Sequence, residues 1–259
     1  MTDRLIPLDS VLNLRDFGGY PTADGRRIVR GRLYRSAHHG RATPTDLEAL
    51  AALELSVIVD LRRAHERQRE PSRRPAGFNA QVIDNDIGDD ADDPSLAFMR
   101  DWDLSVEPLQ GYLADYYRQA PFEPRHVDLY ARYFHALGQT DGAVLIHCAA
   151  GKDRTGLLAA LTHHLLGVSR EDLVSDYLLT NTALDFERRL PQMTRDLSDH
   201  AGRELSAAAT RAAMGVDAAY LDTAIAAIEA AHGDLDGYLH DVLGVAPALK
   251  DRVRARLLV

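Results

Sequence analysis

Residues 143–156 read A-V-L-I-H-C-A-A-G-K-D-R-T-G, and this stretch decides the fold. Its first five residues, 143–147, are mostly apolar, which is typical of a buried parallel strand. A glycine-containing loop follows, and beyond it the leucines between 157 and 165 recur at helical spacing. The stretch therefore predicts a strand, a tight loop and a helix in direct succession.

A loop of this kind forms an anion site without needing a positively charged chain. Where a strand passes through a short loop into a helix, successive backbone N–H groups face one concavity at the positive end of the helix dipole. A phosphate dianion is the natural occupant. The residues expected to form this phosphate cradle are Ala149, Ala150, Gly151, Lys152, Thr155 and Gly156.

The loop also holds a candidate nucleophile. Cys148 is the chain's one cysteine, and five residues separate it from Arg154. Helix N-termini and nearby arginines lower the pKa of thiols from the usual value near 8.5, so we expect Cys148 to be a thiolate. Arg154 presents a planar fork for two phosphate oxygens. We expect Thr155 to donate its hydroxyl to the sulfur when it leaves, and His147 to support the loop rather than to act as a base.

The rest of the chain predicts an α/β fold. A second buried strand is expected at 56–61 and a third near 80–84, with turns marked by glycines at 18, 19 and 25. We expect a central, mostly parallel sheet surrounded by helices, in a single domain over 1–259. Helical patterns occupy about 106–119, 125–138, 170–180, 182–195, 203–213, 217–232 and 246–257.

Composition excludes several functions. The net charge of -9 argues against general nucleic-acid binding. No stretch approaches the roughly 18 apolar residues of a membrane span, and the N-terminus lacks a signal-peptide pattern, so we expect a cytoplasmic protein, with export without a signal left open. The pairs His38-His39 and His163-His164 lack metal-ligand spacing, so no metal or other cofactor is expected.

Residues 147–156 are similar to the signature loop of protein tyrosine and dual-specificity phosphatases. Three further elements, N-L-R-D-F-G-G-Y at 13–20, V-D-L-R at 59–62 and Y-L-A-D-Y-Y-R at 112–118, resemble the bacterial group of that family to which mycobacterial protein tyrosine phosphatase B belongs. Within these elements, we expect Asn13 and Arg15 to fix the N-terminal turn.

The resemblance implies a protein tyrosine phosphatase fold with a helical lid insertion at about 85–125. It also implies a metal-free, two-step hydrolysis of phosphate monoesters through a phosphocysteine, which releases inorganic phosphate. The leading substrate would be protein phosphotyrosine. Phosphoserine/threonine proteins and phosphoinositides are the alternative substrates.

The general acid is open among four aspartates, because the Trp-Pro-Asp tripeptide that supplies it in typical tyrosine phosphatases does not occur in this chain. Asp153 ranks first because it lies in the signature loop, as in lipid phosphatases of the myotubularin type. Asp60 ranks second because it ends a buried strand at the edge where sites form in open α/β sheets. Asp86 and Asp103 rank lower because sequence does not place their loops. Lys152 resembles a lysine that favours multiply charged substrates.

Other functions compete with this hypothesis. A lone cysteine at a strand end is often a small buried hydrophobic residue. A catalytically silent phosphate-binding module would use the same cradle, although a pure binder does not need a thiolate. A rhodanese-like sulfurtransferase also places a cysteine in an anion loop, but the Arg-Thr-Gly ending favours a phosphatase.

Overall fold

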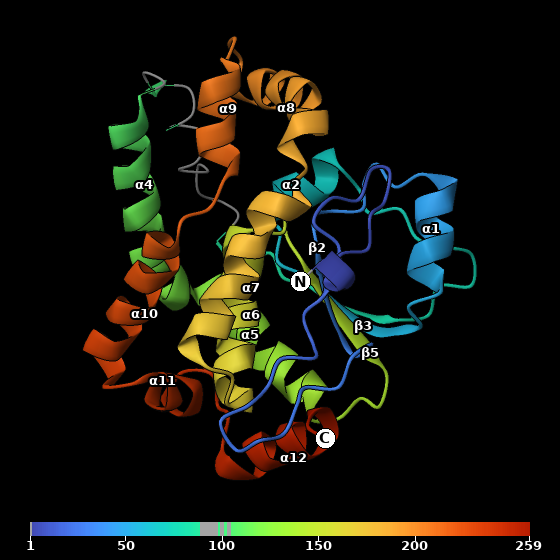
Figure 1. The fold of residues 1–259 in the computed structure, drawn as a ribbon, viewed down its shortest axis with the longest axis vertical. Helices are drawn as coiled ribbons and strands as arrows, with labels where there is room; N and C mark the ends of the chain where they lie inside the picture. The colour runs from blue at the N-terminus through green and yellow to red at the C-terminus, as the bar shows by residue number, and fades with distance from the viewer. Residues whose placement is uncertain (1, 89–97, 99–100, 103–104) are drawn as a thin grey trace.

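The computed structural model describes residues 2–88, 98, 101–102 and 105–259 (Figure 1). Five strands form one sheet in the order β1-β2-β5-β3-β4. β1 is antiparallel to β2, whereas all other neighbouring strands are parallel. The predicted mostly parallel sheet is therefore confirmed. The strands are β1 Arg15–Asp16, β2 Leu33–Ser36, β3 Leu55–Asp60, β4 Gln81–Ile83 and β5 Ala143–His147.

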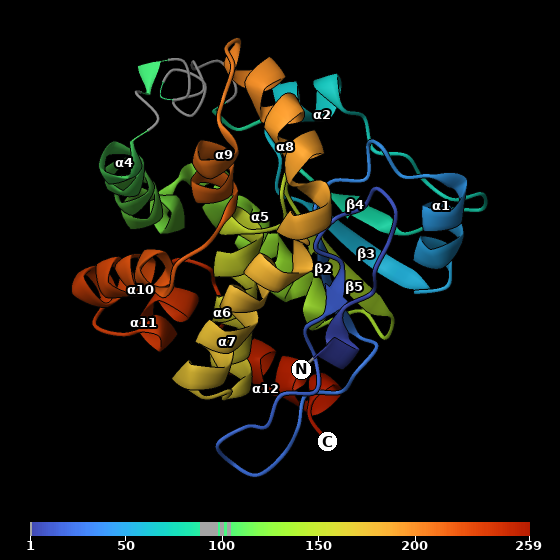
Figure 2. The ribbon, with the colours of Figure 1, turned by 45° about the horizontal axis from the view of Figure 1, so that its top comes forward.

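Helices cover both faces of this sheet, as Figures 1 and 2 show from two directions. They are α1 Pro44–Ala51, α2 Ala64–Arg69, α4 Val106–Gln119, α5 Pro124–Leu137, α6 Asp153–Leu166, α7 Arg170–Ala183, α8 Phe186–Ala201, α9 Ala207–Met214, α10 Ala218–His232, α11 Leu235–Asp241 and α12 Pro247–Leu257, with 3₁₀ turns at Thr2–Arg4 and Ala120–Phe122. Two short helices, α2 and α11, were not expected. No α2 residue is buried, so the apolar periodicity on which the prediction relied is missing there.

Successive residues of the central strands β3 and β5 pack on opposite faces of the sheet. Ile58 and Leu145 pack with Leu50 of α1 on one side of the sheet. Val59 and Ile146 pack with α5 and α6 on the other side, in the largest apolar cluster. Because side chains alternate along a strand, a continuous apolar run is what a strand buried on both faces requires. This explains why 56–61 and 143–147 were recognisable as strands.

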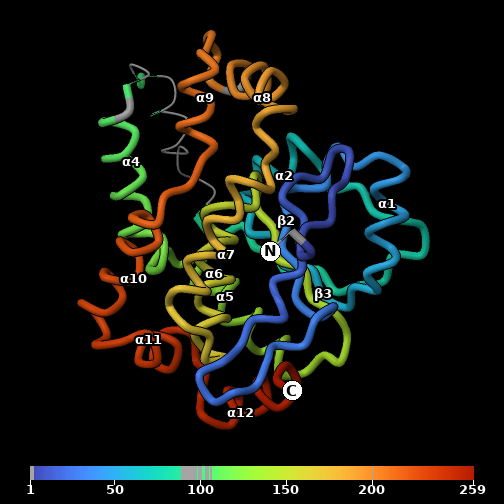
Figure 3. The backbone as a smooth tube through the Cα atoms, in the orientation of Figure 1, coloured from blue at the N-terminus to red at the C-terminus, as the bar shows by residue number. Residues whose placement is uncertain are grey.

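The C-terminal residues of the chain form hydrogen bonds with the segment at 27–29 near its N-terminus. Arg27 and Val259 exchange two backbone hydrogen bonds of 2.8 and 2.9 Å. The N–H of Val29 donates to Leu257 at 2.8 Å, at the end of α12. Figure 3 shows the last helix beside the N-terminal segment. The C-terminal helix is thereby fixed to the same body as the sheet.

Three helices, α4, α8 and α9, form a separate apolar cluster that we call the roof. Figure 1 shows α8 and α9 side by side, with α4 across from α9. Its buried members are Trp102, Leu109, Leu113, Ala201, Leu205 and Ala209. α4 falls within the lid expected at about 85–125, although 89–97, 99–100 and 103–104 lie outside the described residues. That the roof moves as a lid stays a prediction. Within the described ranges, no helix is both long and apolar enough to cross a membrane.

Candidate active site

The loop between β5 and α6 turns so tightly that one position must be glycine. Gly151 has a φ of +68°, a conformation that costs other residues strain. A Cβ atom there would also lie 2.3 Å from the carbonyl oxygen of Ser36 on the neighbouring strand β2. The loop is therefore pressed against the sheet edge, and its helix begins at Asp153.

The outward-facing carbonyls of this loop are held by buried donors. The Asn13 side chain donates to the carbonyls of Gly151 at 2.8 Å and Ala150 at 3.3 Å. Arg35 donates to Gly151 O at 3.0 Å and to Lys152 O at 3.4 Å. In a trans peptide the N–H points opposite to the C=O. Binding these carbonyls from outside therefore turns the following amides towards the concavity, as an anion cradle requires.

Asp176 of α7 anchors these donors. It pairs with Arg15 at 3.2 Å and with Arg35 at 2.7 Å, and all three side chains are at most 1% exposed. Burial opposes the carboxylate, but the two guanidinium groups hold the pKa of Asp176 well below its usual value. We expected Asn13 and Arg15 to fix the N-terminal turn; in the structure Arg15 donates to Asn13 O at 3.4 Å, and Asn13 also reaches the loop. Arg35 and Asp176 were missed, because no local pattern joins residues that are 141 positions apart.

Arg154 is fixed beside the loop by Glu66 of α2. Its two terminal nitrogens donate to the two carboxylate oxygens at 2.6 and 2.8 Å, and one of them also lies 3.2 Å from Leu61 O. Burial opposes the charge of Arg154, but Glu66 and the Cys148 sulfur raise the pKa of Arg154 well above its usual range. Sequence reasoning assigned no role to Glu66, whose partner Arg154 is 88 positions away in the chain.

A cavity of about 530 Å³ lies between the loop and the roof. Its floor includes Ala149, Ala150, Lys152, Asp153 and Arg154, whereas Cys148 is only 2% exposed. The roof contributes mainly aromatic and aliphatic side chains, and arginines lie among the remaining lining residues. The aromatic and aliphatic roof residues are Leu109, Tyr112, Leu113, Tyr116, Met193, Leu197, Ala213 and Met214, and the arginines besides Arg154 are Arg41, Arg63, Arg69 and, on α8, Arg189.

Lys152 joins the loop to the roof. Its ammonium donates to Ala213 O at 2.6 Å and to Gly215 O at 3.3 Å, at the end of α9. It also lies 3.6 Å from the Asp153 carboxylate. Asp153 lines the cavity and accepts a hydrogen bond of 2.7 Å from the Tyr117 hydroxyl. The loop lysine is thus already engaged with backbone carbonyls.

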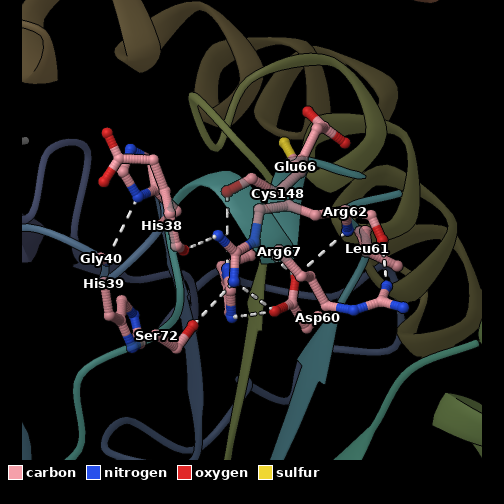
Figure 4. A network of polar contacts seen from close by, with 12 residues as sticks. His38, His39, Gly40, Asp60, Leu61, Arg62, Glu66, Arg67, Ser72 and Cys148 are labelled. Atoms are coloured by element: carbon pink, nitrogen blue, oxygen red, sulfur yellow. Dashed lines mark hydrogen bonds and ion pairs between the residues drawn. The ribbon is translucent and has the colours of Figure 1, made fainter. Parts of the chain in front are cut away.

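Asp60 lies in a different environment from Asp153. Its two oxygens accept hydrogen bonds of 2.9 and 2.7 Å from Arg62, and it is 2% exposed (Figure 4). Arg62 also donates to Ser72 at 2.8 Å. The nearest nitrogen of His147 is 3.6 Å from Asp60. Burial lowers the pKa of His147 to about 4, although Asp60 opposes the shift. A neutral His147 is suited to supporting the loop.

The remaining candidate residues are Asp86, Asp103 and Thr155. The Asp86 side chain is 75% exposed and pairs with Arg67, away from the cavity lining. Asp103 lies outside the described residues. The Thr155 hydroxyl is fully buried and forms no hydrogen bond within the described part of the chain, so its proton is uncommitted. The same part of the chain contains no group of three or more His, Cys, Asp or Glu side chains able to hold a metal.

Removing the charge of Asp176 should loosen the whole loop support. In Asp176→Asn two buried guanidinium groups lose their counter-charge, and breaking such a pair costs about 3–5 kcal/mol. We expect a loss of this size in the free energy of unfolding in urea. The matched control is Asp222→Asn, which breaks an exposed pair with Arg170 whose side chains are about half exposed and should change stability by less than about 1 kcal/mol. Equal effects in the two variants would contradict the anchoring role.

The Arg154–Glu66 pair should make stability depend on acid pH. Burial opposes ionisation, but Arg154 lowers the pKa of Glu66 from 4.5 to about 2. The pair's contribution is therefore complete above pH 4.5 and is lost as pH falls through 2. Glu66→Gln should be less stable than the parent by on the order of 3 kcal/mol at pH 7. That difference should shrink between pH 4.5 and pH 3 in urea unfolding, and a constant difference would contradict the assignment.

The sequence as a whole was compared with known proteins. The model of the tyrosine phosphatase family matches residues 6–259. A Cupriavidus necator protein that carries a tyrosine-protein phosphatase name is 32% identical over 243 residues, which are 93% of this chain and 84% of that protein. The triple specificity protein phosphatase PtpB of Mycobacterium tuberculosis is 30% identical over 276 residues, 97% of this chain and 98% of its own length.

A tyrosine-protein phosphatase of Nostoc commune is 29% identical over 247 residues, covering 92% of this chain and 78% of that protein. These matches extend far beyond the loop at 147–156, through the sheet and the roof helices alike. The chain therefore belongs to the tyrosine phosphatase family, and it is an enzyme of the tyrosine and dual-specificity phosphatase class.

Proposed function

We propose that this enzyme hydrolyses protein phosphotyrosine through a phosphocysteine on Cys148. The observation that carries the proposal is the placement of Arg154. A bidentate contact with Glu66 fixes the guanidinium at the N-terminus of α6, and buried donors bind the carbonyls on the outer side of the loop. Amides, dipole and guanidinium together favour a phosphate at that point.

In the first step the Cys148 thiolate attacks phosphorus, and an S–P bond forms as the bond to the leaving oxygen breaks. Charge on the transferring oxygens is stabilised by the loop amides and by Arg154, which are in place before the reaction and need no reorganisation. The leaving oxygen needs a proton. Asp153 is the aspartate candidate that lines the cavity floor, and we assign it this role.

In the second step the Asp153 carboxylate accepts a proton from water as the water oxygen attacks phosphorus. The S–P bond breaks, inorganic phosphate leaves, and the thiolate returns. The uncommitted Thr155 hydroxyl is proposed to donate to the departing sulfur. Asp60 is held by Arg62 and is buried away from the cavity. A positioning role through His147 therefore suits it better than proton transfer.

The shape of the cavity favours an aromatic phosphate ester. Tyr112, Leu113 and Tyr116 of α4 line the cavity together with Met193 of α8, and burying an aromatic ring against such surfaces is favourable. A phosphoserine side chain would leave most of this apolar lining unfilled. The relative named for triple specificity keeps phosphoserine/threonine proteins and phosphoinositides as the alternative substrates.

The nucleophile can be tested with Cys148→Ser. We expect the parent to release phosphate from a phosphotyrosine peptide and the variant to show no turnover, because a neutral serine hydroxyl cannot replace the thiolate. Phosphate release is measured with malachite green, and phosphate binding by calorimetry should persist in the variant. Phosphoserine and phosphothreonine peptides and phosphoinositide micelles are assayed in parallel.

The results with these substrates distinguish the proposed function from its alternatives. Turnover by Cys148→Ser equal to that of the parent would reject the mechanism. Phosphate binding by a parent that hydrolyses no substrate would favour a non-catalytic phosphate-binding module. Faster hydrolysis of phosphoinositides or of phosphoserine peptides than of phosphotyrosine peptides would replace the substrate class while leaving the mechanism intact.

The general acid can be tested by comparing Asp153→Asn with Asp60→Asn. Loss of a positioned acid costs roughly 10²-fold or more, and the cost should grow as the leaving phenol becomes more basic. We expect this leaving-group dependence in kcat/KM for Asp153→Asn across a series of aryl phosphates. Asp60→Asn should lower activity evenly across the series, since it acts through the loop. The reverse pattern would move the acid to Asp60.

A further inference from the structure

Two buried tyrosines form a chain of hydroxyl groups that ends on the Asp153 carboxylate. Tyr117 of α4 is fully buried, and its hydroxyl donates to Asp153 Oδ1 at 2.7 Å. The hydroxyl of Tyr177, on α7, lies 2.7 Å from that of Tyr117. Because Tyr117 has one hydroxyl hydrogen and gives it to Asp153, Tyr177 must donate to Tyr117. Both hydroxyl dipoles therefore point towards the carboxylate, and each strengthens the other.

We propose that Tyr117, supported by Tyr177, is a positioning residue that orients Asp153 for proton transfer and stabilises its carboxylate once the proton has left. The proposal rests on the function proposed above, in which Asp153 is the acid. It adds a residue from α4, which lies outside the signature loop and belongs to the roof. Without this hydrogen bond, the Asp153 carboxylate would keep, among its contacts with the described residues, only the ion pair with Lys152 at 3.6 Å.

The geometry gives the two oxygens of Asp153 different roles. Oδ1 accepts the Tyr117 hydrogen, so Oδ2 is the oxygen that carries the transferable proton. When the P–O bond breaks, the proton moves from Oδ2 to the leaving oxygen and the negative charge returns to a carboxylate that already holds a hydrogen bond. In the second step Oδ2 accepts the proton released by the attacking water. The hydrogen bond to Oδ1 need not break at any stage.

The tyrosines act as fixed donors and not as a proton relay. Burial raises the pKa of Tyr117 and of Tyr177 well above the usual value of 10. Both hydroxyls therefore stay protonated at neutral pH. A Tyr→Phe change at either position removes one hydrogen bond without altering the charge of the site.

Few other titratable groups lie near Asp153. Lys152 is 3.6 Å from Oδ2, but its ammonium donates to the carbonyls at the end of α9. Tyr116 of α4 and Tyr220 of α10 interact with Asp153 electrostatically, and burial raises the pKa of both. Tyr220 also stacks on the Tyr117 ring at 5.7 Å, which holds the ring in place. Arg154 follows Asp153 in the chain and lines the same cavity, so Lys152 and Arg154 are cations near this carboxylate, and both are unchanged in a tyrosine variant.

The test is Tyr117→Phe, assayed as kcat/KM against pH with aryl phosphates of weakly and strongly basic leaving groups. A hydrogen bond to a charged group is worth about 1.5–3 kcal/mol, so we expect a loss of about 10-fold or more with the most basic leaving phenol and a smaller loss with the least basic. The descending limb, which reports loss of the acid's proton, should move to higher pH by about 0.5–1 unit. Tyr177→Phe should shift it in the same direction by less.

The matched control is Tyr133→Phe. Tyr133 is also fully buried, and its hydroxyl lies 2.9 Å from that of Thr162, at a distance from the cavity lining. The two variants therefore lose the same chemical group from equally buried positions. We expect similar losses in thermal stability, but an unshifted pH profile and unchanged leaving-group dependence for Tyr133→Phe.

A double variant separates positioning from general damage. In an Asp153→Asn background, Tyr117→Phe should cost less than about 2-fold in kcat/KM, because the residue it positions has lost its proton. Equal losses in both backgrounds, or a Tyr117→Phe profile that matches that of Tyr133→Phe, would overturn the inference. If Cys148→Ser or Asp153→Asn instead retains full activity, the proposed function itself fails, so the two failures are distinguishable.

Discussion

The site depends on one constraint: the carbonyls of the loop at 148–152 must be hydrogen-bonded on its outer side so that its amides can face inward. Asn13 and Arg35 supply those hydrogen bonds, and Asp176 holds Arg35 and Arg15 in place. Each donor is buried, so water cannot substitute for it. The buried ion pairs of Asp176 with Arg15 and Arg35 therefore help to set the conformation of the anion-binding loop.

This arrangement explains how an acidic protein can bind an anionic substrate. The net charge of -9 describes the whole chain, whereas the proposed phosphate site consists of loop amides, the α6 dipole and Arg154, in a cavity lined by further arginines. Buried ion pairs contribute little net stability because desolvation offsets their attraction. The pairs on Asp176 and Glu66 are better understood as devices that fix geometry, since each holds a guanidinium whose position determines what the loop can bind.

The roof and the floor are connected through the signature loop itself. Lys152 donates to the carbonyls at the end of α9, and Asp153 accepts from Tyr117 of α4. The sequence interpretation treated these two loop residues as groups facing substrate. In the structure both also contact helices that cover the cavity. A change in the position of the roof would therefore change the hydrogen bonding of Asp153, the proposed acid. The apolar residues of α4 line the same cavity on the side of the roof.

The sequence by itself determined the parts that depend on local pattern. The continuous apolar runs at 56–61 and 143–147 specified strands buried on both faces, and the spacing of Cys148, Gly151 and Arg154 specified an anion loop at a helix start. The order of the strands, the partners Glu66 and Asp176, and the contact between Tyr117 and Asp153 came only from the tertiary structure. The three side-chain contacts join residues that are 36, 88 and 141 positions apart. No periodicity encodes such pairs, because they depend on how helices dock around the sheet and not on the conformation of any one segment.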